Sequence, residues 1–249
     1  MARKIVAGNW KMHGLGRDLT RIEAIATLSA AARCEVLLCL PATLIERACR
    51  VSGPDMAIGG EDCHPNMQGA HTGEISAVML ADAGASHVIL GHSERRADHG
   101  ETDEIVASKV EAALQADLIA IVCLGETLAE RDAGETLAVV GRQLAASIPE
   151  GADPARLIVA YEPVWAIGSG RTPTTAEIAE VHADLRAGLA ARFGTQAAAD
   201  VPLLYGGSVK PGNAAAIFAL PEVDGALVGG ASLDPADFGP IITALDGAQ

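Results

Sequence analysis

Short apolar runs recur along the whole chain, and the stretches between them have the residue spacing of amphipathic helices. The runs are rich in valine, isoleucine, leucine and alanine, and their apolar residues follow one another without polar alternation. This pattern is typical of strands that are covered on both faces, as in parallel sheets flanked by helices. We therefore predict eight strands, at residues 4–7, 35–40, 56–59, 87–90, 118–124, 157–161, 203–205 and 225–228.

Two of the intervening stretches carry clear signals for the start of a helix. Thr102 precedes two acidic residues, and Thr174 and Glu177 have the spacing of a capping box. An apolar stripe at helical spacing follows each start: Val106, Val110, Ala113 and Leu114 in the first helix, and Ile178, Val181, Leu185 and Leu189 in the second. Strands that alternate with such helices indicate an α/β fold.

Chain length and connectivity decide between two α/β architectures. Eight strand–helix units within 249 residues match the size of a closed (β/α)8 barrel. An open doubly wound sheet is the rival, but no Gly-x-Gly-x-x-Gly pattern follows the first strand, which argues against its dinucleotide-binding form. No linker or shift in composition divides the chain. We therefore predict one domain over residues 1–249, with eight parallel strands ringed by helices.

Charge and composition exclude several classes of function. The net charge is −14 and no basic block offsets it, which argues against nucleic-acid or anionic-membrane partners. The five cysteines and seven histidines show no metal-type spacing, so we predict no metal. The N-terminus has no signal-peptide region and no run is long enough for a membrane helix, so we predict a cytoplasmic protein.

The carboxyl ends of barrel strands meet at one mouth, so residues that follow a strand are candidates for chemistry. Glu162 follows the strand at 157–161, and Pro163 then directs the chain away from it. The loop at residues 163–173 contains two glycines that allow large backbone changes. We interpret the segment as a catalytic base with a lid; the alternative is a surface glutamate before an ordinary loop.

Glycine pairs follow the last two predicted strands. Gly206 and Gly207 follow the seventh strand, and Gly229 and Gly230 follow the eighth. Glycines there let an anion approach backbone N–H groups without a Cβ in the way, and barrels commonly bind phosphate after these two strands. Two pairs on neighbouring strands predict a phosphate site. The alternative is that they only permit tight turns.

Lys11 and His92 are the remaining candidates at the mouth. Lys11 follows the first strand and would attract an anion against the negative charge of the whole protein; the alternative is a solvated loop lysine. His92 follows the fourth strand at the start of a short helix, where a neutral imidazole is favoured over a cation. A hydrogen-bonded structural histidine is the alternative. A carboxylate, an imidazole, a cation and a phosphate cradle on one rim favour catalysis.

With these residues in place, the chain resembles the triosephosphate isomerase family essentially from end to end. The motifs that carry the resemblance are Ala7-Gly8-Asn9-Trp10-Lys11, Gly91-His92-Ser93-Glu94-Arg95-Arg96, Ala160-Tyr161-Glu162-Pro163-Val164-Trp165-Ala166-Ile167-Gly168 and Tyr205-Gly206-Gly207-Ser208. Four long motifs in this order are very specific. The resemblance implies a TIM barrel, in which a lid loop and a carboxylate base beside a neutral histidine are established features of the family.

The resemblance also implies the reaction. It is the interconversion of dihydroxyacetone phosphate and glyceraldehyde 3-phosphate through an enediolate, a step of glycolysis and gluconeogenesis that needs no cofactor. Glu162 would move a proton between the two carbons, and His92 would polarise the carbonyl and move protons between the oxygens. Lys11 would stabilise the oxyanion and the phosphate, and Asn9 would orient the substrate.

Other residues take their roles from the same resemblance. Backbone N–H groups would bind the phosphate at Gly168, Ser208, Gly229 and Gly230. The neighbours expected around the catalytic residues are Glu94, as a partner of the Lys11 ammonium, Ser93 and Cys123. The loop at about residues 65–76 resembles the family's dimer loop, which implies a homodimer with Thr72 at the tip and Glu74 paired with Arg95 of the other subunit.

Two departures from the family pattern and two rival functions complete the reading. Residues 171–173 replace the common Lys-Thr-Ala with Arg-Thr-Pro, and Glu61-Asp62 replaces an amide pair, adding negative charge. A Schiff-base sugar-phosphate aldolase is one rival, but the sixth strand ends on Glu162 where such an enzyme commonly has a lysine. A phosphate-binding barrel without catalysis is the other, since barrels host many functions.

Overall fold

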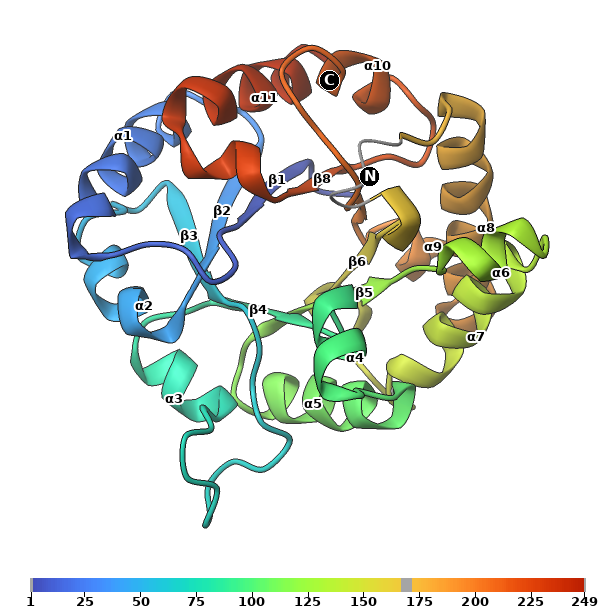
Figure 1. Cartoon of the computed structure of the whole chain (residues 1–249), viewed down its shortest axis with the longest axis horizontal. Coiled ribbons are helices and arrows are strands. Elements are labelled where there is room, and N and C mark those ends of the chain that lie inside the picture. The colour runs from blue at the N-terminus through green and yellow to red at the C-terminus, as the bar shows by residue number, and fades with distance from the viewer. Residues whose placement is uncertain (1, 167–171, 249) are drawn as a thin grey trace.

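The eight predicted strands form one closed parallel barrel. The computed structural model describes residues 2–166 and 172–248, and Figure 1 looks along the barrel, with its helices outside the ring of strands. The strands pair in sequence order, and β8 pairs with β1 to close the ring. Their bounds are β1 Ile5–Asn9, β2 Glu35–Leu40, β3 Met56–Gly60, β4 His87–Leu90, β5 Ile119–Leu124, β6 Leu157–Tyr161, β7 Leu203–Tyr205 and β8 Gly225–Val228.

The uninterrupted apolarity of the strands has a direct cause in this architecture. Alternate side chains of each strand point into the barrel or out towards the helices, and both sides are buried. Ile5, Leu37 and Ile121 belong to the cluster that fills the barrel. Val6, Leu38 and Val122 belong to the larger cluster beneath the helices. A polar residue would be buried in either position, so the sequence shows no alternation.

The helices lie between the strands and cover the outside of the barrel. Thr102 and Thr174 accept hydrogen bonds from the third residue of α5 and α8, and Glu177 completes the predicted capping box. No helix within the described residues is long and apolar enough to cross a membrane. The α-helices are α1 Leu19–Ser29, α2 Ala42–Cys49, α3 Ala77–Asp82, α4 Ser93–His99, α5 Asp103–Gln115, α6 Leu128–Asp132, α7 Thr136–Ser147, α8 Thr175–Phe193, α9 Thr195–Ala198, α10 Ala214–Phe218 and α11 Pro235–Gly247.

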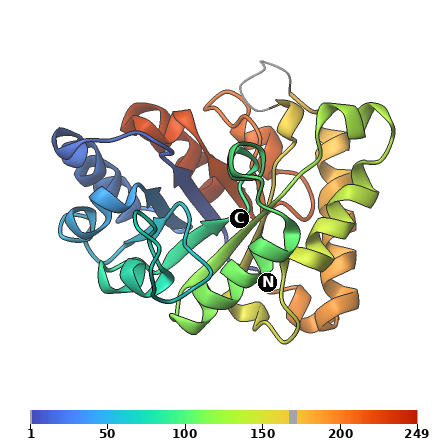
Figure 2. The ribbon, with the colours of Figure 1, turned by 60° about the horizontal axis from the view of Figure 1, so that its bottom comes forward.

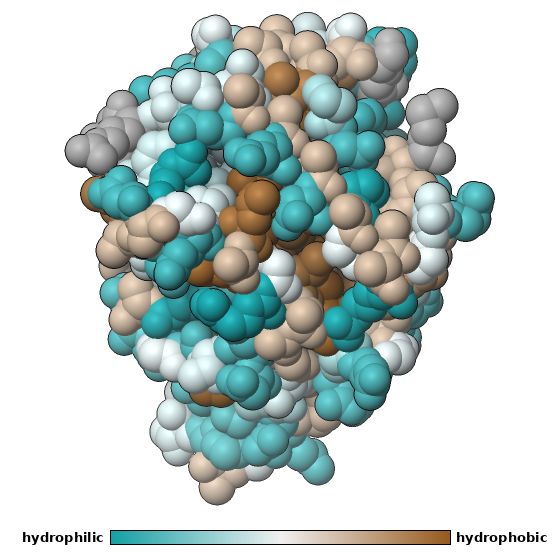
Figure 3. Space-filling view, turned by 90° about the vertical axis from the view of Figure 1, so that its right-hand side faces the viewer, coloured by the Kyte–Doolittle hydropathy of each residue, from teal (hydrophilic) through white to brown (hydrophobic). Residues whose placement is uncertain are grey.

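One end of the barrel and one of its sides carry features that bear on function. In the side view of Figure 2, α4 and the short 3-10 helix η3 (Val164–Ala166), which follow β4 and β6, lie at the upper end. On the side formed by α7 and α8, Figure 3 shows a hollow with apolar side chains at its base. A groove of about 360 Å³ on this side is lined by Leu144 of α7 and Gly188 of α8.

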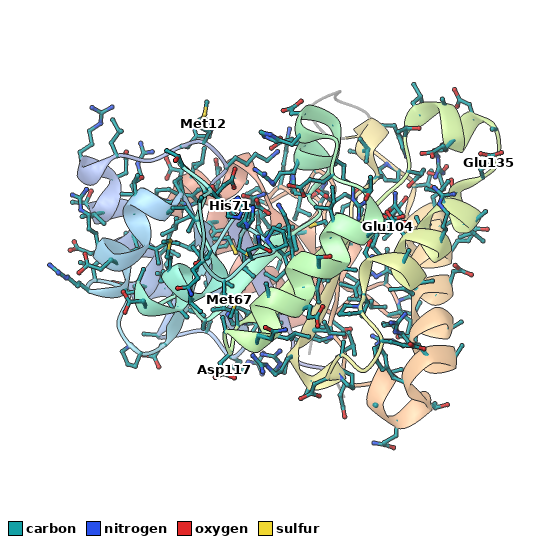
Figure 4. The ribbon with its side chains drawn as sticks, turned by 90° about the horizontal axis from the view of Figure 1, so that it is seen from below. Met12, Met67, His71, Glu104, Asp117 and Glu135 are labelled. Carbon is teal, nitrogen blue, oxygen red and sulfur yellow. The ribbon has the colours of Figure 1, made fainter. Side chains whose placement is uncertain are left out.

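One long connection projects from the barrel. The segment between β3 and α3 extends away from the ring in Figure 1 and contains the predicted dimer loop at residues 65–76. Thr72 and Glu74 are both exposed on it. Figure 4 shows His71 on this segment and Met12 protruding beside the mouth, and Met12 is 96% exposed. The segment therefore presents exposed polar side chains to the solvent, and the exposed Met12 lies on a different loop, the one after β1.

Candidate active site

Glu162 and His92 meet at the carboxyl ends of β6 and β4. The Nε2 atom of His92 lies 2.9 Å from Oε1 of Glu162. The backbone N–H of Ser93 donates to Oε2 of Glu162 at 3.0 Å, and the Ser93 hydroxyl donates to Oε1 at 3.4 Å. Glu162 is only 2% exposed. A carboxylate held this far from water is a stronger base than one in solution once its hydrogen bonds are released.

His92 is held in the tautomer that carries its proton on Nε2. It caps α4, and the backbone N–H of Glu94 donates to its Nδ1 at 3.2 Å. Burial lowers the pKa of His92, but the charge of Glu162 and the hydrogen bond to it raise that pKa more, so the net direction is upward. The hydrogen bond at Nδ1 opposes protonation of the ring, because an imidazolium would point its Nδ1–H at the Glu94 N–H and bring two donors together. The arrangement therefore favours a neutral ring that donates from Nε2.

The environment of Glu162 keeps its carboxyl group ionised although it is buried. Burial raises the pKa of Glu162, but His92, the Ser93 N–H and the Lys11 charge together lower it below its usual value. Cys123, at 0% exposure, lies beside the carboxylate, and burial together with the charge of Glu162 raises the pKa of its thiol. The thiol is thus a neutral hydrogen-bonding neighbour of the base.

Lys11 stands opposite this pair on the end of β1. Its Nζ atom lies 2.5 Å from Oε1 of Glu94, and its backbone N–H donates to Oδ1 of Asn9 at 3.1 Å. The backbone of Lys11 has a φ of 55°, which is unusual and costly for a residue with a side chain. The Asn9 side chain stabilises this turn, so Lys11 and Asn9 are fixed in position together.

A cavity of about 440 Å³ collects most of the predicted site residues. Glu162 does not line it; its carboxylate lies behind His92, beside a second cavity of about 250 Å³ that Ser93 also lines. Gly168 lies outside the described residues. The residues that line the larger cavity are Asn9, Lys11, His92, Glu94, Gly206, Gly207, Ser208, Val209, Lys210, Leu227, Gly229, Gly230 and Ala231.

The two glycine pairs differ in why they lack a side chain. A Cβ on Gly206 would lie 2.9 Å from Cγ of Glu162, and one on Gly207 would lie 2.1 Å from the Tyr205 hydroxyl oxygen. Within residues 2–166 and 172–248, a Cβ on Gly230 would have no neighbour within 4 Å, and one on Gly229 would meet Cε of Lys11 at 3.6 Å. The backbone N–H of Gly206 donates to Tyr161 at 2.7 Å and is not available to a ligand. The cradle interpretation therefore fits the second pair, whereas close packing against β6 and β7 explains the first.

The predicted dimer residue Arg95 already has partners within this chain. Its Nε atom lies 2.6 Å from Oε1 of Glu101 and 2.9 Å from Oδ2 of Asp62. The Nζ atom of Lys109 lies 2.6 Å from the same Glu101 oxygen and 2.7 Å from Oδ1 of Asp62. We call these four residues the charge cluster. The sequence reasoning missed it, because its members become neighbours only through the barrel topology.

Glu126, like the charge cluster, was given no role in the sequence analysis. It follows β5 and is completely buried. The Trp165 indole donates to its Oε1 at 2.8 Å, and the Tyr161 hydroxyl and Arg131 contact the same oxygen at 3.2 Å. Its position after a strand was the available signal. In the part of the chain that the structure describes, no group of three or more His, Cys, Asp or Glu side chains could hold a metal ion.

Comparisons with known proteins agree with this geometry. The family model for triosephosphate isomerase matches residues 4–245. Proteins named triosephosphate isomerase from Jannaschia sp. and Ruegeria pomeroyi are 65% and 63% identical over 249 residues, with 100% of this chain and 100% and 99% of the relatives covered. The crystal structure of triosephosphate isomerase from Bartonella henselae aligns with a TM-score of 0.91 at 48% identity, covering 97% of this chain and 98% of that one. The chain belongs to the triosephosphate isomerase family.

Proposed function

We propose that this mouth interconverts dihydroxyacetone phosphate and glyceraldehyde 3-phosphate, the reaction of the family. The observation that carries the proposal is the buried pair of Glu162 and His92, whose Oε1 and Nε2 atoms lie 2.9 Å apart beside a cavity that Lys11 lines. A base, a hydrogen-bond donor for an oxyanion and a cation are what a proton transfer next to a carbonyl requires. All three come from this one chain, which we take to be one domain.

The chemistry begins at the carbon next to the carbonyl. Glu162 turns from the Ser93 N–H towards the cavity and removes a proton from this carbon. The electron pair of the C–H bond forms a double bond between the two carbons, and the π pair of the carbonyl moves to its oxygen to give an enediolate. His92 donates its Nε2 proton to that oxygen and takes the hydroxyl proton of the neighbouring carbon. Protonated Glu162 then returns its proton to the second carbon. No atom is gained or lost, and no cofactor takes part.

Lys11 and the backbone bind the anionic parts of the substrate. The Lys11 ammonium, already attracted by Glu94, neutralises the negative charge that develops on the enediolate oxygens. The phosphate accepts hydrogen bonds from the backbone N–H groups of Ser208, Gly229 and Gly230. This placement is supported by the cavity that these residues line and by the open space at both glycines. Gly168, outside the described residues, would supply the fourth N–H group.

Two experiments test the reaction and its base. In deuterated solvent, NMR should show exchange of the substrate proton next to the carbonyl in the parent. We expect Glu162→Gln, which cannot accept the proton, to lower this exchange by about 10³-fold. Glu111→Gln, an exposed glutamate of α5, is the matched control and should leave it unchanged. Exchange at the parent rate in Glu162→Gln would remove Glu162 from the role of base.

The aldolase rival is disfavoured by the state of its only candidate lysines. The Nζ atom of Lys11 lies 2.5 Å from Oε1 of Glu94, so an attack of this amine on a carbonyl would have to break that contact. Lys210 lines the cavity but is exposed. Borohydride reduction in the presence of dihydroxyacetone phosphate should therefore trap no substrate on the protein. A trapped adduct at either lysine would favour the aldolase.

We further infer a cytoplasmic homodimer in which the loop at residues 65–76 inserts into a second subunit. The exposed loop residues Thr72 and Glu74 and the exposed apolar side chains of Met12 and Met79 support such an interface. The Arg95 guanidinium already contacts two carboxylates, those of Asp62 and Glu101, and Glu74 of the other subunit would be a third. Sedimentation at assay concentrations should give a dimer. A fully active monomer would contradict the inference.

A further inference from the structure

Residues 208–210 follow β7 and form one wall of the cavity. The side chain of Asn213 forms hydrogen bonds with the backbone of this wall. The backbone N–H of Lys210 donates to Oδ1 of Asn213 at 2.7 Å, and Nδ2 of Asn213 donates to the carbonyl oxygen of Ser208 at 2.9 Å. The backbone N–H of Asn213 donates to the Lys210 carbonyl at 3.1 Å. Three hydrogen bonds therefore join Asn213 to the segment at residues 208–210.

These contacts fix the direction of the peptide groups in the wall. Peptide groups are planar, so holding the Ser208 carbonyl and the Lys210 N–H sets the planes on both sides of Val209. The Ser208 N–H belongs to the preceding peptide, and only the φ and ψ angles of Ser208 separate it from the planes that Asn213 holds. Ser208, Val209 and Lys210 all line the cavity, whereas Asn213 does not. Asn213 is half-buried and lies before α10, on the far side of the wall. Its amide acts on the cavity only through the backbone that it holds.

Within the part of the chain that the structure describes, some backbone groups of the wall have hydrogen-bond partners, and the Ser208 N–H does not. The Ser208 carbonyl and the Lys210 N–H face Asn213. Among the described residues, none accepts a hydrogen bond from the backbone N–H of Ser208. A donor without an internal partner on a cavity wall is available to an anion. The turn thus directs its satisfied groups outwards and leaves an unsatisfied one at the cavity.

We propose that Asn213 is a positioning residue for phosphate, holding the segment at residues 208–210 in the conformation that presents the Ser208 N–H to the ligand. This inference rests on the proposed function, because it assumes that the phosphate of the substrate occupies the cavity. Without the amide, the segment gains backbone freedom that phosphate binding must then remove, and preorganised donors are what make such binding strong.

The proposal is separable from a purely structural role by comparing substrates with and without the phosphate. In Asn213→Ala we expect KM for glyceraldehyde 3-phosphate to rise about 10-fold and kcat to change less than about threefold, the size expected for lost hydrogen bonds that act on binding. Proton exchange on unphosphorylated glyceraldehyde should be unchanged. Asn213→Ser, whose hydroxyl still accepts from the Lys210 N–H, should lie between Asn213→Ala and the parent.

A matched control removes a similar local hydrogen bond at the other end of the barrel. Oδ1 of Asp153 accepts from the Ala155 N–H at 3.0 Å. Asp153 lies ahead of β6, at the opposite end of that strand from Glu162. Asp153→Ala should lower the melting temperature by an amount comparable to Asn213→Ala and leave KM unchanged. An equal loss of exchange on phosphorylated and unphosphorylated substrates in Asn213→Ala would overturn the proposal, as would an unchanged KM.

Binding of inorganic phosphate distinguishes this inference from the proposed reaction. Titration of the parent should shift the backbone amide resonance of Ser208, and Asn213→Ala should need about 10-fold more phosphate for the same shift. A parent that binds phosphate at Ser208 but does not isomerise triose phosphates would contradict the proposed function alone. Equal phosphate affinity in the parent and in Asn213→Ala would contradict the role of Asn213 alone.

Discussion

The two sides of the barrel mouth use polar groups in opposite ways. After β3 and β4, the four residues of the charge cluster are paired with one another, and the Lys109 ammonium alone contacts Glu101 and Asp62. After β7 and β8, Ser208, Gly229 and Gly230 line an open cavity, and among the described residues nothing lies within 4 Å of a Cβ placed on Gly230. On the first side the four charges of the cluster pair with one another, although Oε2 of Glu101 has no hydrogen-bond partner among the described residues. On the second side, the proposed function assigns the free donors to a ligand.

The difference shows what burial requires of a charged group. A charge removed from water must find a partner, and the charge cluster supplies it from the protein. Its effect on pKa values is visible: burial raises the pKa of Glu101, but Lys109 and Arg95 lower it more, so the net direction is downward. The Glu162–His92 pair is intermediate, because in the proposed reaction each group would exchange its present partner for the substrate. We expect substitutions to affect stability in the cluster and catalysis in the pair.

Removal of the central cation of the charge cluster should have the largest effect on stability. Lys109→Met keeps the stem of a side chain that is only 6% exposed but leaves Glu101 and Asp62 with Arg95 alone. We expect a loss of about 3–5 kcal/mol in the free energy of unfolding, measured with urea, because a buried carboxylate loses its partner.

A second substitution shows whether charge is the cause. Glu101→Gln added to Lys109→Met removes the carboxylate that was left unpaired, so the double variant should be more stable than Lys109→Met. The kcat of folded Lys109→Met should stay within about threefold of the parent. If kcat fell in proportion to stability, the distinction between the two sides of the mouth would be wrong.

Shortening the catalytic carboxylate should give the opposite pattern. Glu162→Asp retracts the base by one methylene, about 1 Å or more, and misplacement on this scale costs about 100-fold in rate. We expect kcat to fall by about 100-fold, equivalent to about 2.7 kcal/mol, with KM and the urea midpoint close to those of the parent. Steady-state kinetics and urea denaturation of the same preparation measure both quantities. A loss of stability above 2 kcal/mol would show that the carboxylate is also structural.

The same contrast explains what could be predicted from the sequence. The barrel followed from the apolar runs, because strands such as Leu157–Tyr161 are buried on both sides and tolerate no polar residue. Residues that follow strands, such as Lys11 and His92, could be placed at the mouth for the same reason. The first strand was predicted two residues short at its end, because Gly8 and Asn9 are poor strand formers that the ladder with β2 nevertheless includes.

Pairings between distant residues could not be predicted in this way. Lys109 lies in the middle of α5, and its contact with Asp62 depends on how α5 packs beside the end of β3. For the glycines after β7 the sequence suggested phosphate access or a tight turn, but a Cβ on Gly206 would collide with the side chain of Glu162. Hydrogen bonds around Asn213 likewise arise from a turn whose geometry is not encoded in a motif. Sequence patterns indicate which residues are buried, but contacts between distant residues become visible only in the folded structure.

Glu61 offers a test between the two sides, because it is half-buried after β3 but is not a member of the charge cluster. Burial raises its pKa to about 8, and the Glu94 charge adds to this, while a Lys11 hydrogen bond and charge oppose it. Among the described residues, its Oε1 has no hydrogen-bond partner. The folded protein therefore keeps a proton that the unfolded chain loses near pH 4.5, and stability should fall as pH rises from about 4.5 to about 8.

Glu61→Gln should remove most of this pH dependence. The amide has nearly the same shape but no charge to bury, so we expect the variant to be more stable than the parent by about 1–3 kcal/mol above pH 8 and similar to it near pH 4. Urea midpoints at several pH values measure this. Parallel curves for the parent and the variant would mean that another group causes the dependence.

The smallest effect should come from an exposed pair of two charges, in contrast to the buried four-residue charge cluster. Glu46 and Arg50 lie one turn apart on α2, and their side chains are 55% and 74% exposed. Water screens both charges, and alanine favours a helix, so Glu46→Ala should change the free energy of unfolding by less than about 0.5 kcal/mol. The measurement is the urea midpoint, beside that of Lys109→Met. If Glu46→Ala cost more than about 1 kcal/mol, burial would not be what separates a structural charge from an incidental one. The contrast would then lie in the number of partners, four charges against two.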